Sequence, residues 1–279
     1  MSGLNKDRLQ HLKAVMEEDV ERGLYFGGVI AVARHGDLGL FEAFGCTDGS
    51  KTRPVKADSV FSLFSITKAF TNVLMFRAIE LGQLALTTKV SDIIPEFSGG
   101  ERKDVTFFHL LTHSAGLPSV YTPKDGMCID RLDEVVAAIC ANVQSEAKPG
   151  VRVDYSPMVN HALMGEAVRR VDPKGRSYRQ LVQQEILDPL GMEDTSVGLR
   201  KDLRDRKIVP DFRGNAAINH LGHSDLGPNG AFEEEDAEMP WVGIVSTGRD
   251  MLRFAEMLRR GGELDGARIL GPARLATPL

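Results

Sequence analysis

Cysteine is scarce in this 279-residue chain, and this scarcity excludes two kinds of scaffold. Cys46, Cys128 and Cys140 are an odd set with no C-x-x-C spacing. We therefore expect neither a disulfide-stapled fold nor a cysteine-ligated zinc site, and the set fits thiols packed as small hydrophobic groups in a reducing compartment. A chain of this length can bury roughly 75% of its unfolded surface, so its core needs no covalent support.

Long hydrophobic runs are also missing. No apolar stretch approaches the roughly 20 residues that a membrane-spanning helix needs, because charged residues recur throughout. Residues 1–23 carry Leu9, Leu12, Met16 and Val20 at helical spacing with acids among them, and they lack the apolar core of a signal peptide. We expect an amphipathic first helix, no membrane partner and a cytoplasmic location.

The chain has no excess of positive charge. Its 34 Lys and Arg residues are outnumbered by 39 Asp and Glu residues, and the net charge is −5. Nucleic acid is therefore not an expected partner, since phosphate binding requires a basic patch and these basic residues are scattered. No G-x-G-x-x-G or P-loop pattern occurs, so we expect no nucleotide cofactor.

Two histidines have the spacing of a zinc pair but lack the rest of such a site. His109 and His113 are four residues apart on a predicted helix. Leu110 stands where the glutamate of an H-E-x-x-H motif would follow His109, and no third ligand is evident. We expect scaffold histidines, no metal and no other cofactor.

Apolar patterns predict a mixture of helices and strands. Two apolar runs around a short turn with Gly36 and Asp37 predict a β-hairpin over residues 27–45. Apolar residues near 3.6-residue spacing predict a buried helix over residues 65–81. Further expected elements are helices over 106–112, 131–144, 158–171, 177–187 and 247–260, a short extended piece over 151–153, a polar surface excursion over 201–240 and a strand over 241–246.

Ser65 and Lys68 are the first candidates for chemistry. The S-x-x-K spacing on a helix brings an amine over a hydroxyl, and a buried amine with a lowered pKa accepts a proton more readily. Ser65 would then be a nucleophile toward acyl groups. The alternative from these residues alone is a plain N-cap serine with a surface lysine. A second copy of the pattern, Ser145 to Lys148, lies at the polar end of a predicted helix, and we expect it to be exposed.

Tyr155 is the next candidate. It follows Pro149-Gly150 and an extended stretch, so by itself it is readily an aromatic residue at the edge of the core. A phenol held beside cations can instead ionise and act as the general base of a serine hydrolase that has no histidine base.

Five segments in this order resemble the serine beta-lactamase-related superfamily, in the branch of class C beta-lactamases, D-stereospecific peptidases and family VIII carboxylesterases. Residues 61–68, FSLFSITK, look like the first motif of that branch. The other segments are 106–117 (TFFHLLTHSAGL), similar to its LLTHTSGL helix, 149–156 (PGVRVDYS), similar to its tyrosine motif, 188–192 (DPLGM) and 243–251 (GIVSTGRDM). The likeness runs over nearly the whole chain.

The resemblance implies a fold. This fold is α/β (α+β) and beta-lactamase/transpeptidase-like, with an antiparallel sheet flanked by helices and a mainly helical inserted region. We expect the α/β part over residues 1–82 and 236–279 and the helical region over residues 83–235.

The resemblance also implies a reaction. Ser65 would be the acylated nucleophile, Lys68 its proton-shuttling partner and Tyr155 the base that activates Ser65 and later the hydrolytic water. The expected activity is that of a carboxylesterase acting on a small-molecule ester or amide through an acyl-serine intermediate, without a cofactor.

The sequence departs from the family pattern in two ways. Pro157 stands where class C beta-lactamases have the asparagine of Tyr-x-Asn, which favours an ester over a lactam substrate. No third motif of the Lys-Thr-Gly type is recognisable, and relatives continue with residues that complete the central sheet, so we expect the domain and its sheet to be incomplete at the C-terminus.

The alternatives to a carboxylesterase are a D-amino-acid peptidase or amidase, a beta-lactamase, an acyltransferase and, from another class, a catalytically inactive binding protein or a fragment. The oligomeric state is not predicted.

Overall fold

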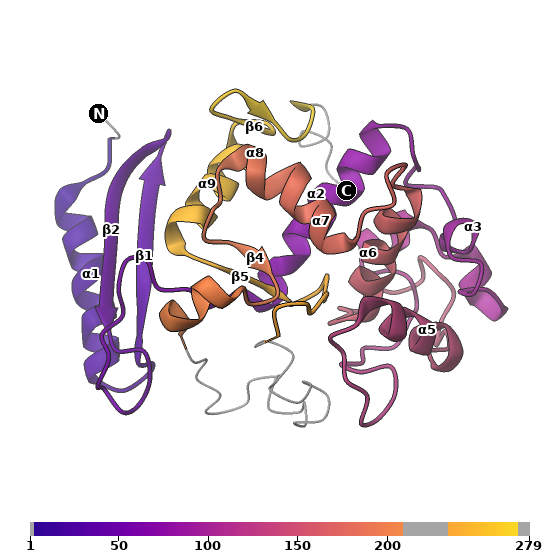
Figure 1. Cartoon of the computed structure of the whole chain (residues 1–279), viewed down its shortest axis with the longest axis horizontal. Coiled ribbons are helices and arrows are strands. Elements are labelled where there is room, and N and C mark those ends of the chain that lie inside the picture. Colours follow the sequence, from indigo (N-terminus) through magenta and orange to yellow (C-terminus); the bar gives the residue numbers. More distant parts are fainter. Residues whose placement is uncertain (1–2, 209–233, 273–279) are drawn as a thin grey trace.

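The computed structural model describes residues 3–208 and 234–272 of the chain (Figure 1). Short 3-10 helices (η1, η2, η4) and one π-helical stretch (η3) accompany the α-helices. The elements in chain order are α1 (Lys6–Glu21), β1 (Gly27–Arg34), β2 (Asp37–Gly45), β3 (Phe61–Ser62), η1 (Phe64–Ile66), α2 (Thr67–Glu80), α3 (Val90–Ile93), η2 (Gly100–Asp104), α4 (Phe107–Leu111), α5 (Leu132–Asn142), α6 (Val159–Val171), α7 (Tyr178–Val182), η3 (Gln183–Leu187), α8 (Asp188–Leu190), β4 (Ser196–Val197), η4 (Lys201–Arg206), β5 (Ile244–Ser246), α9 (Gly248–Arg259), β6 (Glu263–Leu264) and β7 (Ala267–Arg268).

Within the described ranges, the named strands pair antiparallel in three small sheets, β1–β2, β3–β5–β4 and β6–β7. The strand expected over residues 241–246 is confirmed in its second half as β5. Its partner β4 comes from the region that we expected to be mainly helical. The extended piece expected over residues 151–153 forms no strand.

The predicted hairpin over residues 27–45 is confirmed, and it forms one side of the molecule. His35 and Gly36 make the two-residue turn with φ of 55° and 88°, the left-handed conformation that tight hairpin turns require. The hairpin lies between α1 and α9 (Figure 1). At Gly39 of β2 a Cβ atom would lie 2.4 Å from Leu4 Cδ1, so the absence of a side chain lets the segment that leads into α1 approach the strand.

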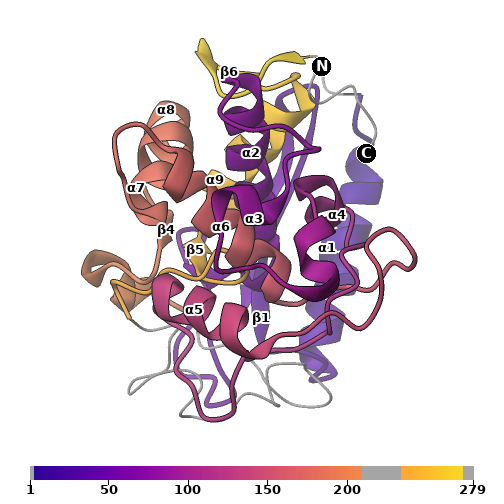
Figure 2. The same cartoon turned by 90° about the vertical axis from the view of Figure 1, so that its right-hand side faces the viewer.

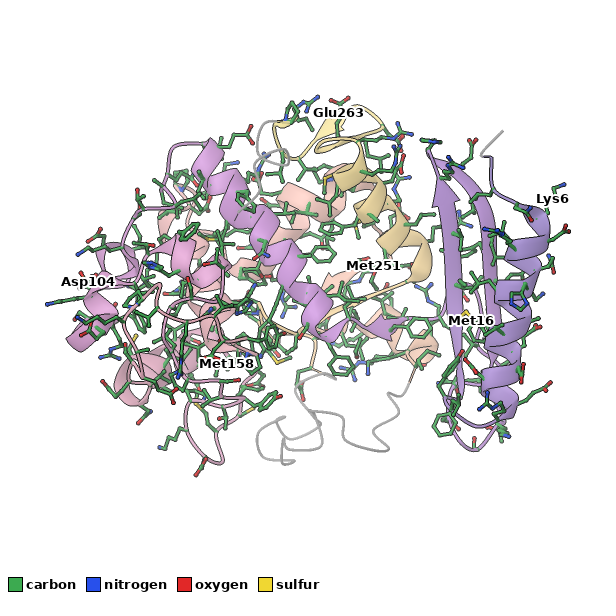
Figure 3. The ribbon with its side chains drawn as sticks, turned by 180° about the vertical axis from the view of Figure 1, so that it is seen from behind. Lys6, Met16, Asp104, Met158, Met251 and Glu263 are labelled. Carbon is green, nitrogen blue, oxygen red and sulfur yellow. The ribbon has the colours of Figure 1, made fainter. Side chains whose placement is uncertain are left out.

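Helix α2 runs through the middle of the molecule, with side chains packed around it (Figure 3). Its buried residues include Phe70, Val73, Leu74 and Met75, and it packs against α6 and α7. Phe70 also stacks on Phe254 of α9, with ring centroids 4.1 Å apart. Helix α2 therefore lies between α9 and the group of helices α3, α5 and α6. That group lies in front of the hairpin in Figure 2.

The remaining predicted helices are found with small shifts of their ends. Helices α4, α5, α6 and α9 lie within the ranges expected for them, and the helix expected over residues 177–187 is divided into α7 and η3. Much of the polar excursion, residues 209–233, lies outside the described residues. In the part of the chain that the structure describes, no helix is long and apolar enough to cross a bilayer. The division into an α/β part and a helical region stays a prediction.

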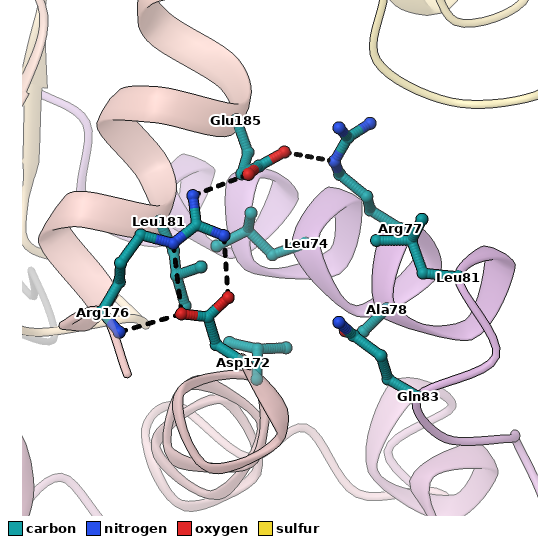
Figure 4. Close-up of a pocket in the computed structure, with 10 residues that line it drawn as sticks. Leu74, Arg77, Ala78, Leu81, Gln83, Asp172, Arg176, Leu181 and Glu185 are labelled. Carbon is teal, nitrogen blue, oxygen red and sulfur yellow. Dashed lines mark hydrogen bonds and ion pairs between the residues drawn. The ribbon is translucent and has the colours of Figure 1, made fainter. Parts of the chain in front are cut away.

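An ion-pair network ties α2 to the segment that connects α6 and α7 (Figure 4). Glu185 accepts hydrogen bonds from Arg77 Nε at 2.6 Å and from Arg176 Nη1 at 2.7 Å. Arg176 also makes a two-pronged pair with Asp172, whose side chain is almost fully buried. The two arginines hold down the pKa of Glu185 against the effect of its burial.

Replacing Glu185 tests whether this network stabilises the fold. The change Glu185→Ala leaves two partly buried guanidinium groups without a shared partner, and we expect the free energy of unfolding in urea to fall by about 2–3 kcal/mol. The control is Asp104→Ala, which removes the exposed Lys89–Asp104 pair and should change that free energy by less than about 1 kcal/mol. Equal losses in the two variants would contradict the stabilising role.

Candidate active site

Ser65 lies at a sharp turn between a strand and a helix. Leu63 N–H still donates to the Ile244 carbonyl of β5, at 2.9 Å. Phe64 then adopts a positive φ of 46°, and the 3-10 turn η1 carries Ser65 into α2. The prediction that the helix begins at Ser65 was therefore wrong by two residues, because the left-handed Phe64 forces a tight turn before regular helix starts at Thr67. Ser65 is exposed at this turn.

Lys68 lies one turn along the same helical run and is buried, with 6% of its surface exposed. Its Nζ atom donates to Ser65 Oγ at 3.0 Å and to the carbonyl oxygen of Trp241 at 3.1 Å. Burial lowers the pKa of the amine from its ordinary value to about 8, because the charged form loses solvation. A neutral amine is thus accessible near neutral pH.

Tyr155 reaches the same hydroxyl from the other side. Its phenol donates to Ser65 Oγ at 2.9 Å, although 90 residues separate the two. The Lys68 amine lies 5.3 Å from the centre of the tyrosine ring, within the range of a cation–π contact. The structure therefore brings all three predicted residues together around one oxygen atom.

A main-chain group that the sequence does not reveal completes the surroundings of the amine. The Trp241 carbonyl is held against α2 by two neighbouring contacts: Thr71 Oγ1 donates to the Pro240 carbonyl at 2.7 Å, and Ile244 N–H donates to Thr67 Oγ1 at 3.1 Å. Both threonines are fully buried. Nothing in the sequence of α2 singles out this carbonyl, because every residue carries a main-chain acceptor.

The two histidines at zinc-pair spacing have separate structural roles. His109 Nδ1 accepts the Thr106 N–H at 3.1 Å and so caps α4. His113 Nδ1 accepts the Ser156 N–H at 3.0 Å. One ring nitrogen of each histidine is thus occupied by a main-chain amide, and in the described residues no group of three or more potential ligands is gathered for a metal.

The second S-x-x-K copy does not build a comparable site. Lys148 is exposed, but Ser145 is half-buried, and its hydroxyl has no hydrogen-bond partner among the described residues. Our expectation that Ser145 would be exposed was wrong. The reason is that the N–H groups of Glu146 and Ala147 both donate to the Gly116 carbonyl, which draws this segment onto the turn after α4.

The arrangement at Ser65 has the elements of a nucleophile with its proton acceptors. One hydroxyl oxygen lies within hydrogen-bond distance of an amine and of a phenol. Either group can take the serine proton when it is in its unprotonated form.

Comparison with known proteins places this chain in a family. The Beta-lactamase family model matches residues 12–277. The chain is 29% identical over 257 residues to penicillin-binding protein 4 of Amycolatopsis lactamdurans, covering 90% of this chain and 64% of that protein. It spans 39% to 64% of the length of the curated relatives that it matches here.

Solved structures agree. A penicillin-binding protein homologue from Caulobacter crescentus superposes with a TM-score of 0.81 at 27% identity, covering 98% of this chain and 75% of that one. A family VIII carboxylesterase superposes with a TM-score of 0.78 at 24% identity, covering 95% and 73%. The resemblance and the beta-lactamase/transpeptidase-like fold predicted from the motifs are confirmed, and the chain belongs to the Beta-lactamase family, within the serine beta-lactamase-related superfamily of hydrolases.

Proposed function

We propose that this protein is a carboxylesterase that hydrolyses small esters through an acyl intermediate on Ser65. The observation that carries the proposal is the pair of hydrogen bonds that Ser65 Oγ receives, from Lys68 at 3.0 Å and from Tyr155 at 2.9 Å. A serine hydroxyl is a weak nucleophile until a neighbouring base takes its proton, and here two such groups are within reach.

In the acylation step, Ser65 Oγ attacks the carbonyl carbon of the ester. The carbonyl electron pair moves onto its oxygen, and the hydroxyl proton passes to the neutral Lys68 amine or to the ionised oxygen of Tyr155. When the tetrahedral intermediate collapses, the bond to the alcohol oxygen breaks. The same proton then goes to the departing alcohol, directly from Lys68 or through the Tyr155 hydroxyl.

Deacylation repeats these transfers with water. A water molecule attacks the acyl carbon and gives a proton to the same pair of side chains. Ser65 Oγ then leaves as the bond to the acyl group breaks, and it regains the proton. The acid product departs and the site returns to its starting state, so no cofactor is required.

One feature favours an ester over a lactam substrate, and a second suits an apolar substrate. Pro157 offers no side-chain amide to a substrate's acyl amide group. Ile66, which follows Ser65 in the chain, is an apolar side chain that is 55% exposed. Exposed apolar side chains of this kind suit a substrate with an apolar acyl or alcohol group.

Removing the nucleophile tests the reaction directly. We expect Ser65→Ala to abolish turnover of p-nitrophenyl acetate and butyrate, a loss on the order of 10⁶ in a well-built site, and to abolish covalent labelling by a fluorophosphonate as read by intact mass. The matched control is Ser145→Ala in the second S-x-x-K copy, which should leave both readouts unchanged. Undiminished turnover in the Ser65 variant would rule the mechanism out. Activity on D-amino-acid amides or on nitrocefin, without activity on esters, would show a D-amino-acid amidase or a beta-lactamase in place of a carboxylesterase.

The protonation state of Lys68 predicts the pH dependence. Because the amine must be neutral to accept the serine proton and its pKa is about 8, kcat/KM for an ester should rise with pH and level off above about pH 8. The change Lys68→Arg places a permanently charged group there and should remove activity at every pH. An activity that is flat between pH 6 and 9, or that survives in the Lys68 variant, would exclude the amine as the base.

A further inference from the structure

His113 contacts Tyr155 and the residues on either side of it, although the proposed chemistry assigns His113 no step. Its carbonyl oxygen accepts the Asp154 N–H at 2.9 Å, and its ring Nδ1 accepts the Ser156 N–H at 3.0 Å. Its ring also packs on the tyrosine ring, with centroids 4.9 Å apart. The residues on both sides of Tyr155 are therefore bonded to one histidine.

The backbone of His113 is bent to make these contacts. Its φ is +54°, a left-handed value that non-glycine residues rarely adopt and that costs about 1–3 kcal/mol. This bend follows the end of α4 and lets the carbonyl and the ring of the same residue meet the segment that carries Tyr155. Asparagine tolerates the left-handed conformation better than most residues, and its Oδ1 is an acceptor close to the position of Nδ1.

The contact with Ser156 requires a neutral histidine ring. Since Nδ1 accepts a main-chain N–H, the proton of the neutral ring is on Nε2. Three ionisable side chains face the ring: Lys68 from α2, His161 from α6 with ring centroids 5.8 Å away, and Tyr155 itself. Burial, followed by the nearby Lys68 charge, lowers the pKa of His113. The neutral ring therefore prevails at neutral pH.

We propose that His113 is a positioning residue that holds the Tyr155 phenol on Ser65, and that protonation of its ring releases this hold. A protonated ring has no acceptor at Nδ1, so the Ser156 N–H loses its partner and the segment that carries Tyr155 loosens. The hold is present above the pKa of His113 and is lost as the pH falls through it. The effect on turnover rests on the proposed function, whereas the hold on the ring does not.

Kinetics of two substitutions at His113 test the positioning role. His113→Ala removes the ring acceptor, and we expect kcat for an ester to fall roughly 10²-fold with little change in KM, as for a misplaced catalytic group. His113→Asn keeps an acceptor and should recover at least tenfold of that loss. If the alanine variant keeps wild-type kinetics, or if both variants lose activity equally, the positioning role is overturned.

The pH profile separates positioning from a general loss of stability. The pKa of His113 is lowered from the ordinary histidine value of about 6.5. On the acid side of that value we expect the slope of log kcat/KM against pH in the wild type to steepen from one proton to two, as His113 is protonated in addition to Lys68. His113→Asn should keep a slope of one, because Oδ1 accepts at every pH in this range. The control His109→Asn, in the helix α4 that ends just before His113, should keep the steepening. If the slope of log kcat/KM against pH still steepens to two protons in His113→Asn, the release step is overturned.

A measurement without substrate keeps this inference apart from the proposed function. The chain has four tyrosines, so with ¹³C label at the ring carbon that bears the hydroxyl, Tyr155→Phe assigns the Tyr155 signal by its loss. Below about pH 6.5, where Lys68 is already protonated, we expect that signal to shift or broaden with falling pH in the wild type and to stay unchanged in His113→Asn. This outcome in a protein without esterase activity supports the hold and refutes the function. A pH-insensitive signal in an active enzyme refutes the hold alone.

Discussion

The burial of the Lys68 amine is the physical constraint on which the site depends. In water a lysine remains charged at neutral pH and cannot accept a proton from serine, whereas a desolvated amine can. Its second partner, the Trp241 carbonyl at 3.1 Å, is a dipole and not a carboxylate. A carboxylate would hold the amine in its charged form, whereas the carbonyl orients the amine and leaves the effect of burial dominant.

The rest of the fold keeps that carbonyl in place. The segment before β5 lies across α2 and is pressed against α6, where a Cβ atom on Gly165 would be only 2.3 Å from Pro240 Cγ. From α7, the fully buried Tyr178 hydroxyl lies 2.7 Å from Thr71 Oγ1, the group that donates to the Pro240 carbonyl. A substitution that enlarges Gly165 would thus act on Lys68 through the main chain, without touching the amine.

The elements of this fold follow from local sequence, but the contacts of the site do not. Two apolar runs around a turn were sufficient to predict the hairpin, and a period-3.6 pattern was sufficient to predict α2, because both are local signals. The approach of Tyr155 to Ser65 spans 90 residues and was expected only through the resemblance of motifs. The Trp241 carbonyl was missed because a main-chain acceptor is common to every residue type. The positive φ of Phe64 was missed because the residue type does not signal it: non-glycine residues, and bulky ones above all, rarely adopt the left-handed conformation.

Backbone strain at two residues shows how the site is built. Among the described residues, non-glycine positive φ occurs at His35, Lys51, Phe64, His113 and Asp265. His35 lies in a tight hairpin turn, where such values are ordinary, but Phe64 precedes the proposed nucleophile and His113 contacts the proposed base. Each strained residue costs about 1–3 kcal/mol, and the surrounding packing must offset this. The bend at Phe64 follows the end of β3, and the bend at His113 follows the end of α4. With these bends, the Ser65 hydroxyl and the Tyr155 phenol, from distant segments, lie beside the buried Lys68 amine. Relaxing either bend would favour the fold locally while separating the three groups.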